Sequence, residues 1–217
     1  MRTTRVTVAA LVAAAALTLT ACGGEPAPAN SVKQISGGQA KAGSATLLDR
    51  PFDKPELVLT DTTGKPWNLR EQTKGRPTLI YFGYTNCPDV CPLTMSNIAV
   101  AKKALPKADQ DKLQVVFVTT DPDRDTPESL GSWLKAQDPS FVGLTGDFAT
   151  IQAAARKLGI GIEAAKKEAD GGVVSMHGAQ VIAFSPKTDE GYVLYGEGTT
   201  VDDYTKDLPK IVKGENP

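Results

Sequence analysis

Two strand-length runs, each apolar along most of its length, constrain the fold of this chain more than any other feature. Residues 78–84 read TLIYFGY, and residues 113–119 read LQVVFVT. Neither run alternates strictly between apolar and polar residues, which is typical of strands covered on both faces of a sheet. A segment with helical character follows the first run and another follows the second. The pattern therefore predicts a layered α/β domain with a parallel sheet at its centre.

The segments around these two strands complete an α/β order of elements. The domain is expected to span residues 46–217, a length that can bury most of its chain around one core. In such sheets the chemistry lies beyond the carboxyl ends of parallel strands, which draws attention to the loop after residue 83. In chain order we expect a hairpin of residues 56–60 and 66–69, helices at 92–105, 126–137 and 147–158, a short strand at 141–144, a terminal hairpin of residues 180–184 and 192–195, and an amphipathic helix at 201–212.

Composition excludes several classes of protein. Of 217 residues, 41% are hydrophobic and 23% are charged, which is ordinary globular usage rather than that of a disordered or collagen-like chain. The single histidine rules out three-histidine zinc sites and HExxH proteases. The 24 basic residues are balanced by 25 acidic ones and form no basic cluster along the sequence, so we expect no nucleic-acid partner.

The N-terminal segment has the pattern of an export signal. Arg2 and Arg5 precede an apolar run, residues 6–19, that is too short to span a membrane. The string LTAC, residues 19–22, closes this segment, and the small residues before Cys22 resemble the lipobox of bacterial lipoproteins. A secretory signal with an incidental cysteine and a transmembrane anchor are the alternatives. We predict a signal peptide at residues 1–21, lipidation of Cys22 and attachment to the extracytoplasmic face of the cell membrane.

A flexible tether is expected to follow the lipidated cysteine. Residues 22–45 are rich in Gly, Pro, Ala and Ser, and Val32 and Ile35 are their only large aliphatic residues. Such a segment cannot bury enough apolar surface to fold. As a random coil it would span roughly 25 Å, which would let a domain reorient close to the membrane.

The loop FGYTNCPDVCP, residues 82–92, carries two cysteines where a strand gives way to a helix. The four-residue spacing of Cys87 and Cys91 places both sulfurs on one face of a helical turn, within reach of a common ion or of each other. Because a helix N-terminus favours thiolate, we expect the pKa of both cysteines to be lowered. A structural disulfide is the alternative, but one closing so short a loop would restrict little chain entropy.

His177 stands directly before the predicted terminal hairpin. In a thioredoxin-type arrangement the loop before that hairpin passes over the helix end that bears Cys87 and Cys91, so the three side chains would converge. Two thiolates and one imidazole suit Cu(I) and, with a further ligand, Cu(II). Zinc is the competing ion, since two cysteines, a histidine and a water are also a zinc set. Met176 is a further candidate ligand, although methionine is usually a core residue.

These motifs together resemble one protein family. The string FGYTNCPDVCPLTM, the downstream strings VTTDPDRDTPESL and FVGLTGD, and His177 before a terminal hairpin are similar to those of the Sco/SenC copper chaperones. The resemblance covers about residues 50–213. It implies a thioredoxin-like fold with an N-terminal β-hairpin extension and an inserted loop or hairpin before the terminal β-hairpin. Some members have an acidic residue at about this chain's Gln152 that helps to hold the oxidised metal. Because glutamine stands there in this chain, the resemblance leaves the identity of any fourth ligand open.

The resemblance also implies a function. Copper, as Cu(I), Cu(II) or both, would be held by Cys87, Cys91 and His177 and delivered to the dinuclear copper centre of cytochrome c oxidase subunit II. A periplasmic-type copper donor protein is a further expected partner. The alternative is a thiol-disulfide oxidoreductase acting on the same acceptor, in which Cys87 attacks and Cys91 resolves. The CxxxC spacing and the absence of proline from residues 175–178 favour the chaperone over the reductase.

Two further segments have simpler interpretations. Asp121, Asp123 and Asp125 alternate like the ligands of a hard cation, but they lack the glycine and terminal glutamate of a calcium loop. A strand end, a turn and a helix cap explain them better. Residues 163–172 are polar and end in glycines, so we expect an exposed loop or hairpin beside the site.

Overall fold

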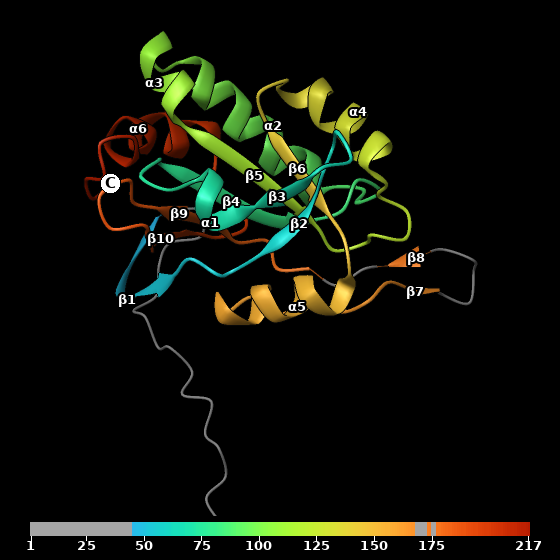
Figure 1. Ribbon diagram of the computed structural model, residues 1–217. Coiled ribbons are helices and arrows are strands. Elements are labelled where there is room, and N and C mark those ends of the chain that lie inside the picture. Colours follow the sequence, from blue (N-terminus) through green and yellow to red (C-terminus); the bar gives the residue numbers. More distant parts are fainter. Residues whose placement is uncertain (1–44, 168–172, 175–176) are drawn as a thin grey trace, which may run out of the picture. The chain divides into compact units, whose positions relative to one another are not determined.

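An eight-stranded mixed sheet organises the part of the chain that the structure describes, in the strand order β1-β10-β9-β4-β5-β6-β2-β3 (Figure 1). Strands β4, β5 and β6 are parallel, and β9 is antiparallel to β4. A separate two-stranded sheet pairs β7 with β8. The strands are β1 (Thr46–Asp53), β2 (Val58–Asp61), β3 (Pro66–Asn68), β4 (Thr78–Gly83), β5 (Gln114–Thr119), β6 (Val142–Thr145), β7 (Lys166–Lys167), β8 (Val173–Val174), β9 (Val181–Phe184) and β10 (Glu190–Tyr195).

The structure is a computed structural model that describes residues 45–167, 173–174 and 177–217. These residues belong to one compact unit. The predicted signal peptide, the predicted lipidation site Cys22, the predicted tether up to residue 44 and Met176 lie outside the described residues. Within the described ranges, no helix is both long enough and apolar enough to cross a membrane.

The central strand β4 is covered on both faces, as its apolar run predicts. All six of its residues are buried, and its four large apolar residues alternate between two hydrophobic clusters. Leu79 and Tyr81 belong to one cluster, while Ile80 and Phe82 belong to the other, as the period-two geometry of a strand requires. The carboxyl end of β4 is thereby held between two packed layers.

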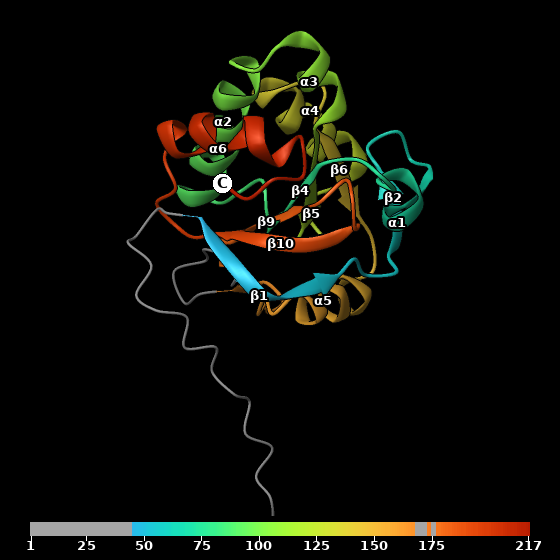
Figure 2. The ribbon, with the colours of Figure 1, turned by 90° about the vertical axis from the view of Figure 1, so that its left-hand side faces the viewer.

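Helices cover both faces of the sheet. Buried residues of α2, α4 and α6 pack in the cluster of Tyr81, and those of α5 pack in the cluster of Ile80. Figure 2 shows α2 and α6 above the sheet and α5 below it. The helices are α1 (Leu69–Gln72), α2 (Val90–Lys103), α3 (Lys107–Lys112), α4 (Pro127–Gln137), α5 (Phe148–Lys157) and α6 (Val201–Ile211).

Side-chain caps set the starts of the last three helices. Thr126 accepts a hydrogen bond from the Ser129 backbone and precedes Pro127, so Thr126 rather than Asp125 caps α4. Asp147 caps α5 in the same way. Thr200 and Asp203 form a reciprocal capping box at the start of α6. These caps satisfy backbone donors that a helix start otherwise leaves unpaired.

The structure differs from the sequence prediction at several elements, and the short helices α1 and α3 are among those that were not predicted. Strand β1 was not predicted; it pairs with β10 at the edge of the sheet, where its Pro51 and its charged residues are tolerated. Helix α2 begins at Val90, two residues before the predicted start at Pro92. Pro92 still lies in the first turn, where a proline costs no intrahelical hydrogen bond.

Candidate metal centre

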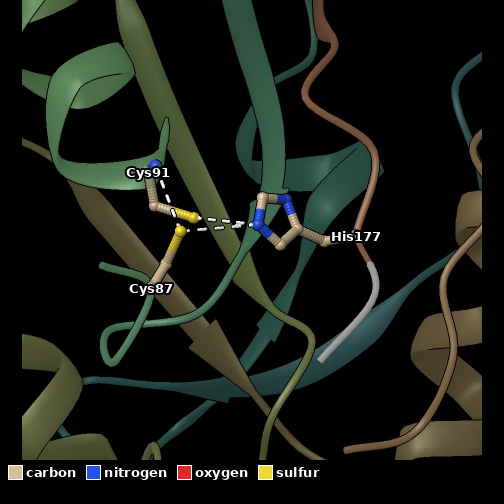
Figure 3. Close-up of side chains that lie close together, drawn as sticks. All are labelled: Cys87, Cys91 and His177. Atoms are coloured by element: carbon tan, nitrogen blue, oxygen red, sulfur yellow. Dashed lines mark hydrogen bonds between the residues drawn. The ribbon is translucent and has the colours of Figure 1, made fainter. Parts of the chain in front are cut away.

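Cys87, Cys91 and His177 meet at the carboxyl end of β4 (Figure 3). Their ligand atoms all lie within 4.8 Å of one another. The Nε2 atom of His177 is 3.5 Å from the Sγ atom of Cys87 and 3.5 Å from that of Cys91. Across the described part of the chain, no other group of three or more His, Cys, Asp or Glu side chains is placed to hold a metal ion.

Sheet topology brings these distant residues together. Cys87 lies in the loop after β4, and Cys91 lies in the first turn of α2. His177 precedes β9, whose first residue, Val181, pairs with Tyr81 near the end of β4. Because β9 runs antiparallel to β4, the segment entering β9 passes the point where β4 ends. This is the convergence that a thioredoxin-type arrangement predicts.

Gly83 allows the Cys91 sulfur to pack against the end of β4. A Cβ atom at this position would lie 2.8 Å from the Sγ atom of Cys91 and 2.6 Å from the Cε1 atom of Tyr81. Both distances are too short for van der Waals contact. A side chain at residue 83 would therefore push the sulfur away from the position it shares with Cys87 and His177.

Two tyrosines surround the ligand group. The Tyr81 hydroxyl, on a side chain that is 1% exposed, donates to the Sγ atom of Cys91 at 3.4 Å. The ring of His177 meets the ring of Tyr84 edge to face, at a centroid distance of 5.3 Å, and that of Tyr81 at 6.2 Å. These contacts restrict the orientation of the imidazole, and the hydroxyl of Tyr81 contacts one sulfur directly.

The two sulfurs differ in environment. Cys87 is 8% exposed and Cys91 is 0% exposed. The Sγ atom of Cys87 accepts a hydrogen bond from the Cys91 backbone N–H at 3.4 Å, a donor supplied by the first turn of α2. Burial raises the pKa of the Cys91 thiol to about 12. The sequence prediction of a lowered pKa is therefore wrong for Cys91, because loss of hydration outweighs the effect of the helix N-terminus.

His177 is arranged as a neutral nitrogen donor. Burial lowers its pKa, which favours the uncharged imidazole. Its Nδ1 atom lies 3.3 Å from the carbonyl oxygen of Gly178, and a carbonyl can only accept a hydrogen bond. That contact is a hydrogen bond only when the proton is on Nδ1, which leaves the Nε2 lone pair facing the two sulfurs.

The separations fit a single ion bound by all three atoms. An ion about 2.0 Å from a nitrogen and about 2.3 Å from two sulfurs, in a trigonal plane, keeps each nitrogen–sulfur pair about 3.7 Å apart. The observed distances from Nε2 to both sulfurs are 3.5 Å. The two nitrogen–sulfur distances are therefore close to those that a single bound ion would require.

The aspartates of the loop after β5 form no metal site. Asp125 is fully buried and accepts hydrogen bonds from Thr85 and Thr119, while Asp121 pairs with Arg124. The structural interpretation of this motif therefore agrees with the structure. Gln152, considered for a fourth ligand, donates to the Ile162 carbonyl at 2.9 Å and accepts from Arg156.

Sequence reasoning missed the residues that support the candidate ligands. Neither Gly83 nor Tyr81 was singled out, although both contact Cys91. Thr85 was also missed, and its contact with Asp125 joins the cysteine loop to the loop after β5. The only local signal was position, because all three lie within six residues of Cys87 at the end of a central strand.

The fold and the site together define a class of protein: a thioredoxin-like domain whose two thiols and one imidazole could hold a metal ion. The sequence model of the SCO1/SenC family matches residues 46–213, so the chain belongs to the SCO1/SenC family. The prediction of this family and of its thioredoxin-like fold is confirmed.

Individual relatives agree with this placement. The copper-bound ScoI of Bradyrhizobium japonicum is 32% identical, with a TM-score of 0.62 over 75% of this chain and 98% of that one. A SCO1/SenC family lipoprotein from Bacillus anthracis is 25% identical, with a TM-score of 0.60 over 76% of this chain and 98% of that one. Mitochondrial SCO2 of Saccharomyces cerevisiae is 34% identical over 117 residues, which are 54% of this chain and 37% of that protein. The chain spans about half, or less, of the length of the curated relatives it matches.

Proposed function

We propose that this protein is a membrane-anchored, extracytoplasmic copper chaperone. Cys87, Cys91 and His177 bind the copper, which is delivered to the dinuclear copper centre of cytochrome c oxidase subunit II. The observation that carries the proposal is the approach of one imidazole nitrogen to 3.5 Å from both sulfurs. The copper-bound ScoI of Bradyrhizobium japonicum, which is 32% identical, supports copper as the metal.

The chemistry of the donor set favours copper over zinc. Thiolates are soft ligands, and two thiolates with one imidazole complete the coordination of Cu(I) without water. Zinc would require a fourth ligand in a tetrahedral arrangement. Cys91 is 0% exposed and Cys87 is 8% exposed, so the ion would be held with little access to solvent. Cu(II) would need a further ligand beyond these three.

Transfer is proposed to proceed by ligand exchange without change of oxidation state. An acceptor thiol bonds to the copper through its sulfur as one sulfur of this chain leaves, and the leaving thiolate takes up the proton that the acceptor thiol gives up. Cys87 is the more exposed of the two sulfurs, so exchange begins there. The predicted lipid on Cys22 and the predicted tether would hold the domain close to a membrane-embedded acceptor. The Bacillus anthracis lipoprotein supports this anchoring.

The alternative function is thiol-disulfide exchange with the same acceptor. One observation favours it: Cys87 and Cys91 are free thiols whose sulfurs lie close enough to approach a single nitrogen atom. The dithiol could reduce an acceptor disulfide, with Cys87 forming the mixed disulfide and Cys91 releasing the reduced acceptor as the intramolecular disulfide forms. The two functions differ in what leaves this chain, which is copper in one case and two electrons in the other.

The deciding experiment offers this chain to the isolated copper-centre domain of an oxidase subunit II. We expect the copper-loaded chain to transfer its copper to the reduced acceptor, as measured by metal content after separation of the two proteins. The metal-free dithiol chain, given the oxidised acceptor, is the parallel sample. Disulfide reduction in that sample with no copper transfer in the first would overturn the chaperone in favour of the reductase.

Removing the Tyr81 hydroxyl tests how the surroundings of Cys91 affect the copper. Tyr81→Phe removes a hydrogen bond to one proposed ligand and leaves the ring in place. Loss of such an outer contact typically costs 10–100-fold in metal affinity, so we expect about a tenfold loss and a shift of the sulfur-to-Cu(II) charge-transfer band. Tyr195→Phe, at a fully buried tyrosine of β10, is the matched control. An identical band and affinity in Tyr81→Phe would show that the hydroxyl does not affect the copper.

A further inference from the structure

An open groove lies beside the candidate metal centre. It runs between the start of α2 and the segment that joins β10 to α6, and its volume is about 520 Å³. Figure 2 shows α2 and α6 lying side by side. The residues that line the groove include Asp89, Val90, Leu93, Asn97, Glu197 and Asp202.

A hydrogen bond connects the two walls of the groove. The side-chain amide of Asn97, on α2, donates to the Thr199 carbonyl at 3.1 Å. The next residue, Thr200, forms the capping box with Asp203 that begins α6. The two walls are therefore connected before any partner arrives, and a ligand would not need to order them.

The groove combines an apolar strip with negative charge. Leu93 is 57% exposed, the highest value among the four exposed large hydrophobic residues of the described ranges. Val90 lines the groove one turn earlier on α2. The carboxylates of Asp89, Glu197 and Asp202 line it too, and no lysine or arginine does. This chemistry complements an apolar segment that carries a positive charge.

The groove also lies next to the chain segment that carries two of the candidate ligands. Asp89 and Val90 lie between Cys87 and Cys91 in the chain. Glu197 lines the opposite wall of the same groove. A segment bound in the groove would therefore lie next to the stretch of chain that carries the two cysteines.

We propose that this groove binds an extended segment of the copper acceptor in which a lysine or arginine stands next to a metal-accepting cysteine. The inference rests on the proposed function and adds to it the chemistry by which the partner is recognised. The apolar part of the segment covers Leu93, and its cation lies among the three carboxylates. Its thiol is then beside Cys87, the more exposed of the two sulfurs.

The test measures binding of a synthetic peptide to the full, metal-free chain under reducing conditions. The probe is a ten-residue peptide with two cysteines flanked by lysines, and a peptide with glutamates in place of the lysines is its control. We expect only the lysine peptide to perturb the amide resonances of residues in the groove, and we expect its affinity to fall as salt is added. Equal binding of both peptides, binding elsewhere or no binding would overturn the proposal.

Paired variants separate the groove from general surface effects. Leu93→Ser combined with Asp202→Asn should weaken binding of the lysine peptide by at least about tenfold. The control combines Val100→Ser, at a residue of α2 that is 51% exposed, with Glu128→Gln, at a first-turn acid of α4. Equal weakening in both double variants would also overturn the proposal.

This experiment is independent of the copper chaperone function. The peptide assay contains no metal, whereas the chaperone function is decided by copper transfer to the oxidase domain. A chain that transfers copper but does not bind the lysine peptide retains the proposed function and lacks this docking site. A chain that binds the peptide in the groove but transfers no copper has the docking site without the proposed function.

Discussion

Replacing either Cys87 or Cys91 by serine is expected to abolish the sulfur-to-copper charge-transfer band that Cu(II) gives with the reduced protein. Serine keeps the size of the side chain but offers a neutral hydroxyl, which is a poor ligand for copper. Loss of an outer contact alone costs 10–100-fold in metal affinity, so loss of a ligand should cost at least about 100-fold. Visible absorption during Cu(II) titration and competition with a chelator measure the band and the affinity.

His177→Ala completes this series and should give a different result. The two thiols remain, so we expect both to react with a thiol reagent as in the unmodified chain, while copper affinity falls. Without the imidazole the ion retains two sulfur donors and loses the nitrogen that lies 3.5 Å from each of them. Unchanged affinity in His177→Ala would remove the histidine from the ligand set.

A buried sulfur that is not a proposed ligand provides the control. Met95 lies one turn after Cys91 on α2 and is 0% exposed. Met95→Leu removes a soft sulfur from the same helix and conserves most of the volume. We expect the band and the affinity to stay as in the unmodified chain. A band that persists in Cys87→Ser or Cys91→Ser would contradict the proposed site.

The fold was predictable from the sequence for those elements whose own residues carry the signal, such as an apolar run or a helix cap. Strands β4 and β5 are buried on both faces and read as apolar runs, and the starts of α4 and α5 carry their own caps. Strand β1 was not predictable in this way. Its sequence TLLDRPFD has no strand pattern, and its conformation depends on pairing with β10, more than 130 residues away.

The candidate site was predictable to a similar extent. The spacing of Cys87 and Cys91 and the position of His177 before a hairpin are local features, and a thioredoxin-type arrangement brings them together. The pKa of Cys91 was predicted wrongly, because its burial depends on packing against Tyr81 and Gly83. Burial is a property of the folded chain, so the spacing of the two cysteines carries no information about it.

The buried carboxylate of Asp125 joins the cysteine loop to the sheet, and its removal should destabilise the protein. It accepts hydrogen bonds from the Thr85 backbone at 3.0 Å, from the Thr85 hydroxyl at 2.5 Å and from the Thr119 hydroxyl at 2.6 Å. Asp125→Ala leaves these donors without their acceptor. We expect the free energy of unfolding to fall by about 3 kcal/mol and the Tm by about 6–12 °C, as measured by thermal unfolding followed by circular dichroism.

The same substitution should weaken copper binding, because Thr85 is only two residues from Cys87. Without Asp125 the loop loses its hydrogen bonds to this carboxylate, and Cys87 is held less firmly beside Cys91. Asp123→Ala is the control, since Asp123 belongs to the same motif but is exposed. It should change neither Tm nor copper affinity appreciably. If Asp125→Ala unfolded at the same temperature as Asp123→Ala, the buried carboxylate would not be what holds the cysteine loop in place.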